Sequence, residues 1–186
     1  MACEVQWNVI VPPATHIEIE GIKYPLEPKD PAVSNNNSFY AAIGKIQNVA
    51  HDKLRQNICQ SMLANKNLYD NEWICTCAIL RAELNDIKRF PKKAEEFTEE
   101  GVKQVWIEYT QNGMRDNVIP EMLEVLETAA YINRVITIVL LNGQSQIVLA
   151  TCFTPDREVI RRDPNREGDL ILVDDNGYYR LLADKV

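Results

Sequence analysis

The spacing of hydrophobic side chains changes once along this chain, and that change constrains the fold more than any other feature. From about residue 38 to residue 132, apolar residues recur every three or four positions, which is the period of an amphipathic helix. After residue 134 they come in short runs of Val, Ile and Leu separated by turn residues, which is typical of strands. Helices followed by strands predict an α+β fold, with a helical lobe packed against a sheet.

Individual elements follow from the same patterns. Helices are predicted from near Ser38 to 46, at 51–64, at about 71–86, within 91–109 with Gly113 ending it, and at 119–132 with Pro120 in its first turn. Strands are predicted at 135–141, 147–152, 170–173 and 178–182, with a tight turn at Asn142-Gly143 and a loop over 154–168.

The first 32 or 33 residues contain several prolines and two strand-like stretches, at 7–11 and 16–19. We expect residues 1–32 to form an extended arm laid over the core, and residues 33–186 to form the domain proper. The two parts together are expected to make a single compact domain, which suits a chain of 186 residues.

Composition excludes several functions. The chain is 46% hydrophobic and 25% charged, a balance typical of soluble globular proteins. Its net charge of −7 repels phosphate backbones and anionic lipids, so neither nucleic acid nor membrane is an expected partner, whereas a basic protein surface would be attracted. Five scattered cysteines and the lack of a secretory signal favour a reducing, cytoplasmic location. No cofactor is expected.

Several stretches resemble the OTU (ovarian-tumour) cysteine deubiquitinases. Val33-Ser-Asn-Asn-Asn-Ser-Phe-Tyr-Ala-Ala-Ile-Gly resembles the family's nucleophile loop and helix, and His51-Asp-Lys-Leu-Arg-Gln-Asn-Ile resembles the helix that follows. Residues 117–138 resemble the family's later helix and strand, and Gly177-Tyr-Tyr-Arg-Leu-Leu resembles the terminal histidine motif. The resemblance covers residues 33–183. It implies a papain-type fold with a helical lobe on a small, mostly antiparallel sheet.

The residues that the family uses for catalysis are replaced. Ser38 stands where the resemblance places the nucleophilic cysteine, Asn35 where it places an aspartate, and Tyr178, or Gly177 in another register, where it places the histidine. A thiol at a helix start is activated by the positive end of the helix dipole, whereas a serine hydroxyl is far less acidic. The simplest structural role for Ser38 is that of an N-cap residue, whose hydroxyl accepts a hydrogen bond from an N–H group at the start of the helix. The sequence therefore favours a non-enzyme, a pseudoenzyme of the deubiquitinase fold.

Our first hypothesis is a non-catalytic module that binds ubiquitin, a ubiquitin-like protein or another protein partner. The resemblance implies a channel for the ubiquitin tail, which Asn37, Ser38, Tyr178 and Tyr179 would flank and which Tyr178 could obstruct. One alternative is an active or residually active ubiquitin isopeptidase, with Ser38 either an unusual nucleophile or an inactivating substitution of the cysteine. Another is a structural or assembly domain of a viral, transposon-derived or effector polypeptide.

Other reactive residues have simpler roles in the sequence pattern. Cys59, Cys75 or Cys77 could act as nucleophile with His51, but cysteines within amphipathic helices are usually core filling. Cys75 and Cys77 point to different helix faces, so no metal site is predicted. Surface or capping roles are expected for the only histidines, His16 and His51.

For three further groups of residues, the sequence is compatible with two roles each. Trp73, Trp106 and Tyr109 are core residues or partner anchors. Acidic side chains at 121, 124 and 127 are a solvated helix face or a surface that steers a basic partner. The asparagines at 35–37 are a polar loop or the remnant of an oxyanion site.

Overall fold

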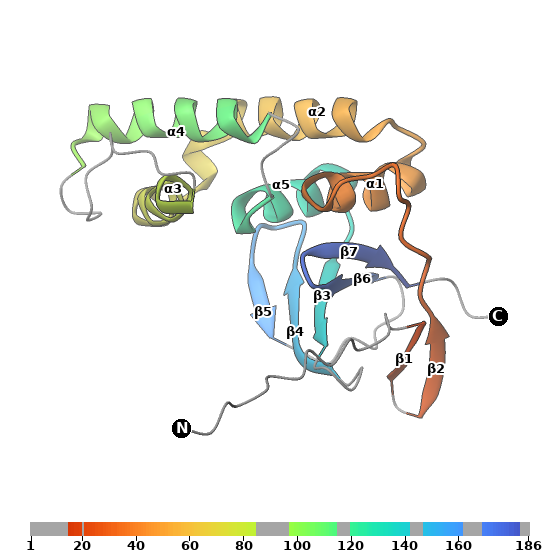
Figure 1. Cartoon of the computed structure of the whole chain (residues 1–186). Helices are drawn as coiled ribbons and strands as arrows, with labels where there is room; N and C mark the ends of the chain where they lie inside the picture. Colours follow the sequence, from red (N-terminus) through yellow and green to blue (C-terminus); the bar gives the residue numbers. More distant parts are fainter. Residues whose placement is uncertain are drawn as a thin grey trace, which may run out of the picture.

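A five-stranded sheet separates a layer of helices from a small N-terminal hairpin (Figure 1). The structure is a computed structural model, and it describes residues 15–19, 21–84, 97–114, 120–141, 147–161 and 169–182. Within these ranges the fold is mixed α+β, as the change in hydrophobic period predicts.

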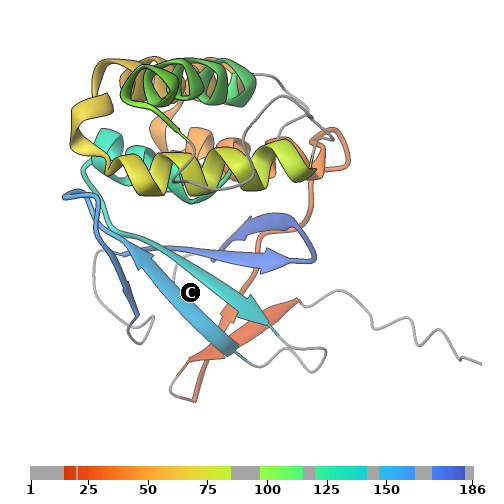
Figure 2. The same ribbon diagram turned by 90° about the vertical axis from the view of Figure 1, so that its left-hand side faces the viewer.

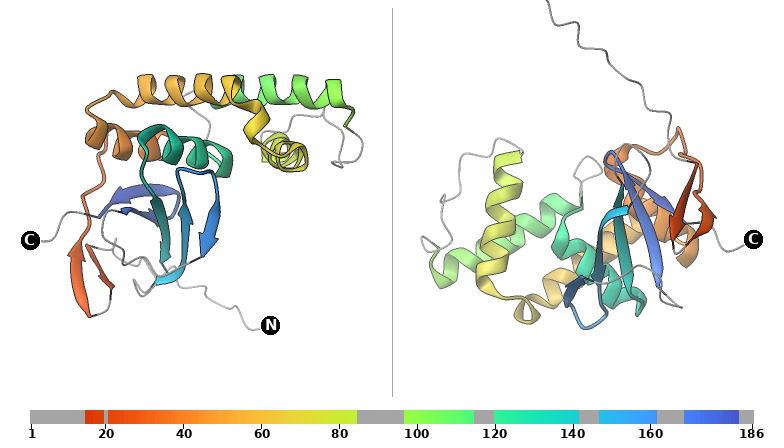
Figure 3. Two further views of the ribbon diagram at one scale, coloured as in Figure 1. Left: turned by 180° about the vertical axis from the view of Figure 1, so that it is seen from behind. Right: turned by 90° about the horizontal axis from the view of Figure 1, so that it is seen from below.

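The helical layer has two levels. It contains α1 (Asn35–Gln47), α2 (His51–Ala64), the short 3-10 helix η1 (Lys66–Leu68), α3 (Asn71–Leu84), α4 (Glu99–Gly113) and α5 (Met122–Ile132). Helices α1 and α5 lie against the sheet, α2 and α4 pack outside them, and α3 packs on α4 (Figures 1 and 3).

The sheet has the strand order β5-β4-β3-β6-β7 (Figure 2). Its strands are β3 (Ile136–Leu141), β4 (Ile147–Phe153), β5 (Val159–Arg161), β6 (Leu170–Asp175) and β7 (Tyr178–Leu181). Only the central pair, β3 with β6, is parallel among the described strands, so the sheet is mostly antiparallel as expected. Strand β7 forms one edge, and α1 packs on it.

Alternating side chains of the sheet serve two cores. Ile136 and Ile138 point into the helical layer, whereas Val139 and Leu141 point to the opposite face, as the two-residue period of a strand requires. The hairpin of β1 (His16–Ile19) and β2 (Ile22–Pro25) covers that opposite face. Buried Ile17, Ile19, Tyr24 and Leu26 supply its side of the second core.

Most predicted elements are present, and their ends need correction. The bounds predicted for α2 agree with the structure, and Asn65 ends this helix. Helix α1 begins at Asn35 rather than near Ser38, because all three asparagines adopt helical geometry after the extended Ser34. Pro120 lies outside α5, since Glu121 is the N-cap residue and closes a capping box with Glu124.

Two short strands escaped the sequence prediction. Strand β5 falls inside the predicted loop 154–168, because a three-residue edge strand has too few alternating residues to stand out in a charged segment. Strand β2 was likewise included in the extended arm. The predicted strand at 7–11 and the Asn142-Gly143 turn lie outside the described residues.

The acidic face predicted for α5 is wrong. Glu124 is 1% exposed and Glu127 is fully buried. Glu124 accepts hydrogen bonds from the Arg81 guanidinium and, at 2.8 Å, from the Tyr109 hydroxyl. The spacing of three residues places the carboxylates on one helix face as expected, but the face points inward.

Glu127 lies in a second buried ion pair. Its carboxylate accepts two hydrogen bonds from Arg157, at 2.9 and 3.1 Å, and further bonds from Ser61, Asn65 and Tyr69. Although burial opposes ionisation, these hydrogen bonds lower the pKa of Glu127 below its usual value. Arg157 thereby ties the turn between β4 and β5 to Glu127 of α5 and to Tyr69.

Aromatic residues in the helical stripes lie in the core. Trp106 and Tyr109 are each 2% exposed and stack on each other, which confirms the core interpretation for these two. Trp73 is half-buried at the margin of the same core. No described helix is both long enough and apolar enough to cross a bilayer.

Candidate functional site

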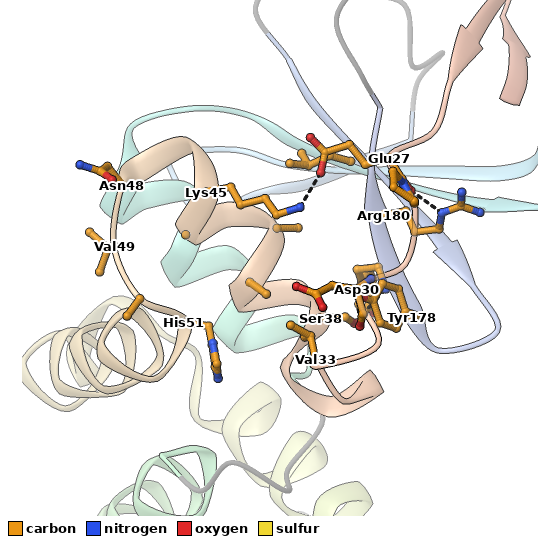
Figure 4. Close-up of a pocket in the computed structure, with 17 residues that line it drawn as sticks. Glu27, Asp30, Val33, Ser38, Lys45, Asn48, Val49, His51, Tyr178 and Arg180 are labelled. Atoms are coloured by element: carbon orange, nitrogen blue, oxygen red, sulfur yellow. Dashed lines mark hydrogen bonds and ion pairs between the residues drawn. The ribbon is translucent and has the colours of Figure 1, made fainter. Parts of the chain in front are cut away.

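A pocket of about 400 Å³ lies beside the start of α1 (Figure 4). Small residues of α1, among them Ser38, Ala41 and Gly44, form its floor. Residues 178–181 of β7 and the segment before α1 form one wall, and residues 48–51 form the other. The pocket brings together Ser38, Tyr178 and Tyr179, three of the residues that the sequence predicts for the site.

The Ser38 hydroxyl joins two elements. It donates a hydrogen bond of 2.7 Å to the backbone oxygen of Asn35 and accepts one of 2.9 Å from the backbone N–H of Tyr179. Ser38 is 1% exposed. Ser38 was expected to be the N-cap of the helix, and it is not. The N-cap residue is Ser34, whose side chain makes no capping hydrogen bond.

The direction of these bonds limits what the hydroxyl can do. A serine nucleophile must pass its proton to a base as it attacks. Here the proton of Ser38 points to the carbonyl of Asn35, which accepts a hydrogen bond but is too weak a base to take up a proton. The arrangement is that of a structural tie between α1 and β7.

Tyr178 binds the segment that precedes α1. Its hydroxyl accepts a hydrogen bond of 3.0 Å from the backbone N–H of Asp30 and lies 3.4 Å from the backbone oxygen of the same residue. The Lys29 ammonium lies 5.3 Å from the centre of its ring. Tyr178 is 7% exposed and lines the pocket.

Tyr179 offers its backbone to Ser38 and its ring to the core. The ring packs edge-on against Phe39, with centroids 5.6 Å apart. Burial, with a smaller contribution from Asp174, raises the pKa of Tyr179 to about 12. A phenol that holds its proton this firmly cannot act as a general base near neutral pH.

The asparagines at the start of α1 are held by a buried arginine that the sequence interpretation overlooked. Arg55 donates to the backbone oxygen of Asn36 at 2.6 Å, to Oδ1 of Asn37 at 2.8 Å and to the backbone oxygen of Gly113 at 3.0 Å. Its guanidinium also lies 4.5 Å from the ring centre of Tyr40. The signal was an arginine directly beside the apolar stripe of α2, where a charge needs partners.

Asn35 contributes only its backbone oxygen among the contacts of the site. It occupies the first position of α1 and is exposed, so its side chain is not placed to orient a base beside Ser38. The position that the resemblance assigns to an aspartate therefore holds no carboxylate.

His51 lines the same pocket and was expected to have a surface or capping role. It is the first residue of α2, half-buried, and its ring is directed away from Ser38 (Figure 4). The other histidine, His16, is exposed on β1, on the far side of the sheet. The pocket that contains Ser38 is therefore lined by one imidazole, that of His51, whose ring is directed away from Ser38 (Figure 4).

Cys59, Cys75 and Cys77 are core residues, as their helical positions predict. Burial is the main reason that the pKa values of the Cys59 and Cys77 thiols rise to about 12. This disfavours the thiolate that catalysis would need. No cluster of three or more His, Cys, Asp or Glu within the described ranges could hold a metal ion.

Two residues that line the pocket, Lys45 and Glu27, form an ion pair. The Lys45 ammonium lies 2.8 Å from Oε2 of Glu27, joining α1 to the segment before it (Figure 4). The hydrogen bond with Glu27 raises the pKa of Lys45. Beside this lysine, Gly44 lies so close to the backbone of Val49 that an added Cβ would come within 2.4 Å of its oxygen. A glycine is therefore required for this wall of the pocket.

Comparison with known proteins identifies the fold. No family model matches the sequence, and no curated protein matches it. Among solved structures, the crystal structure of the viral OTU domain protease from Farallon virus matches with a TM-score of 0.55 over 86% of this chain and 83% of that one. Sequence identity is 16%, so the likeness concerns the fold alone. The chain has an OTU-like fold, which confirms the fold class expected from the resemblance.

Proposed function

We propose that this OTU-like domain is a non-catalytic binding module whose partner is ubiquitin, a ubiquitin-like protein or another protein. The hydrogen bonding of Ser38 carries the proposal. Its hydroxyl proton is directed to the Asn35 carbonyl, and its oxygen accepts the N–H of Tyr179. Both interactions stabilise the contact of α1 with β7, and neither activates a nucleophile.

The environment of Ser38 also supports the absence of acid–base chemistry. Isopeptide cleavage needs a base for the nucleophile and a proton donor for the departing amine. Tyr178, at the position of the family's histidine, uses its hydroxyl to bind the backbone of Asp30. The raised pKa of Tyr179 keeps the neighbouring phenol protonated.

The binding half of the proposal rests on the pocket and on charge. A pocket of about 400 Å³ with a floor of small residues can accept an extended peptide segment. Ser38, Tyr178 and Tyr179 line this pocket, and we assign Asn37, which does not line it but precedes Ser38 in α1, to the same binding site. The net charge of −7 would speed encounter with a partner whose surface is basic.

Hydrolysis of ubiquitin conjugates is the second candidate, and one observation favours it. His51 lines the pocket that contains Ser38, and a side-chain rotation is a small change compared with building a new base. In this alternative His51 would accept the hydroxyl proton of Ser38, and the hydrogen bond from Ser38 to the backbone oxygen of Asn35 would be lost.

A turnover assay separates the two candidates. The substrate is ubiquitin carrying a fluorogenic amide at its C-terminus, and the proteins are the wild type, Ser38→Cys and, as background, Ser38→Ala. The proposal predicts that neither the wild type nor Ser38→Cys releases fluorophore faster than Ser38→Ala. Turnover by the wild type that depends on Ser38 and His51 would establish the hydrolase. Turnover by Ser38→Cys alone would show that the remaining groups suffice for catalysis, and would refute the proposal.

A further inference from the structure

Residues 26–33 form a strap that runs from the N-terminal hairpin along β7 to the start of α1 (Figure 4). Glu27, Pro28, Asp30 and Val33 of this strap line the pocket that contains Ser38. We propose that the strap is a releasable latch on this pocket, closed by the Tyr178 hydroxyl, and that a partner enters when the latch opens. The latch itself stands on the geometry below; its role in partner entry rests on the proposed function.

One end of the strap is anchored firmly. Leu26 is 6% exposed and pairs with Leu182 in an isolated β-bridge. The N–H of Glu27 donates to the Leu181 oxygen at 3.0 Å, and Nε of Arg180 donates to the Glu27 oxygen at 2.8 Å. Backbone pairing and buried apolar contact hold this end to the sheet.

The middle of the strap lacks such anchors. Residues 28–32 are all exposed, so the strap buries little apolar surface there. Segments with few buried contacts open at a small fraction of the global unfolding free energy. The middle is therefore held by polar contacts to its neighbours.

Ion pairs contribute little to closing the strap. Lys45 and Glu27 have side chains that are 55% and 35% exposed, and Lys29, which pairs with Asp175 at 3.2 Å, is 40% exposed. Exposed pairs of this kind are screened by water and salt. They favour the closed position without fixing it.

Tyr178 makes the contact that is neither exposed nor ionic. Its hydroxyl accepts from the N–H of Asp30 and lies within hydrogen-bond reach of the Asp30 oxygen, and its side chain is buried. The strap turns beyond this point, where the N–H of Val33 donates to the Asp30 oxygen at 3.0 Å. One phenolic hydroxyl thus fixes the middle of the strap over the pocket.

Opening the strap would remove one wall of the pocket and leave the floor on α1 in place. A ligand that binds only the open form has an apparent affinity reduced by the fraction of molecules that are open. Loosening the latch should therefore raise partner affinity by the same factor as it raises opening.

Native-state hydrogen exchange on the full chain tests the latch. The variant is Tyr178→Phe, and the control is Tyr131→Phe, which removes the hydroxyl of an exposed tyrosine of α5 that does not line the pocket. We expect the amide of Val33, whose own acceptor remains, to exchange about fivefold faster or more in Tyr178→Phe, the effect of about one hydrogen bond, whereas the amide of Glu27, at the anchored end, should change little. Amides of α2 and β3 should not change. An unchanged Val33 amide, or equal acceleration throughout the domain, would overturn the latch.

Ubiquitin titration of the same variants tests the coupling to binding. Tyr178→Phe should bind more tightly than the wild type by the factor found in exchange, and Tyr131→Phe, a change outside the pocket, should bind as the wild type does. Equal or weaker binding by Tyr178→Phe would overturn the coupling. Faster strap exchange with no binding by any of the proteins would leave the latch intact and would rule out ubiquitin as the partner.

Discussion

The backbone N–H of Tyr179 donates a hydrogen bond of 2.9 Å to the hydroxyl of Ser38, joining the edge strand β7 to the first turns of α1. An edge strand presents N–H groups that no neighbouring strand accepts, and such groups invite pairing with another chain. Here a side chain satisfies one of them. Ser38 therefore stabilises the sheet edge.

Loss of this hydroxyl should destabilise the domain. Ser38→Ala leaves the N–H of Tyr179 without its acceptor in a largely buried position, and we expect a loss of about 1–3 kcal/mol in the free energy of unfolding. Ser34→Ala is the matched control, because the Ser34 side chain makes no capping hydrogen bond. Urea unfolding of the three proteins measures both effects. A loss for Ser38→Ala no larger than that for Ser34→Ala would contradict the structural role.

Arg55 should be indispensable to the start of α1. Arg55→Met keeps much of the side-chain volume but removes the donors to Asn36, Asn37 and Gly113. Since hydrogen bonds from charged groups contribute about 1.5–3 kcal/mol each, we expect a loss of at least about 3 kcal/mol. Amide NMR shifts should change most at residues 36–38. Lys53→Met, an exposed change in the same helix, should alter stability by less than about 0.5 kcal/mol; similar losses for both variants would show that the contacts of Arg55 are not special.

Gly44 should tolerate no side chain. In Gly44→Ala the new Cβ would lie 2.4 Å from the Val49 oxygen, so α1 or the loop must shift. We expect a loss of about 1–3 kcal/mol and altered amide shifts at residues 48–51, where the pocket wall lies. Gly101→Ala is the control, because its Cβ would meet only the Thr98 side chain, at 3.1 Å. Thermal unfolding that ranked Gly101→Ala as the more damaging change would refute the close approach.

The ion pair of Glu127 and Arg157 should make the domain sensitive to acid. The folded pKa of Glu127 is lowered, so its contribution is complete above the unfolded pKa, about 4.3, and is lost as the pH falls through the folded value. Glu127→Gln should lower stability by about 3 kcal/mol at pH 7. The difference between wild type and variant should shrink progressively as the pH falls below the unfolded pKa.

Other carboxyl groups contribute to the same pH range, and a control separates them. Burial raises the pKa of Glu121, which gives its contribution the opposite sign. Only the difference between the wild-type and Glu127→Gln curves isolates Glu127. Glu100→Gln, at a side chain that is 87% exposed, should leave the wild-type curve unchanged. A difference for Glu127→Gln that stays constant from pH 7 to pH 3 would contradict a lowered pKa.

The sequence predicted elements whose signal is local. Helix α2 has a regular apolar stripe and an asparagine at its end, so both of its bounds were correct. Strand β5 was missed because its identity comes from pairing with β4, which a three-residue segment does not encode by itself. Helix α1 began earlier than predicted, because tertiary contacts from Arg55 stabilise asparagines that have low helix propensity.

The resemblance to the OTU family indicated that Ser38, Tyr178 and Tyr179 lie together, and all three line one pocket. It did not indicate the hydrogen bonds that these residues make. The inward direction of Glu124 and Glu127 depended on Arg81 and Arg157, which lie far away in sequence. No pattern within α5 indicates such partners, so its charges were expected to face solvent.

The first test of a ubiquitin-binding site is a heteronuclear NMR titration with ubiquitin, because it detects and maps weak binding in the absence of any reaction. We expect saturable shifts clustered at Asn37, Ser38, Tyr178 and Tyr179, with smaller changes at residues 27–33, and ubiquitin recovered unmodified. Spectra that remain unchanged at millimolar ubiquitin would contradict a ubiquitin-binding site. Concentration-dependent association of the protein in that same experiment would point to an assembly domain instead.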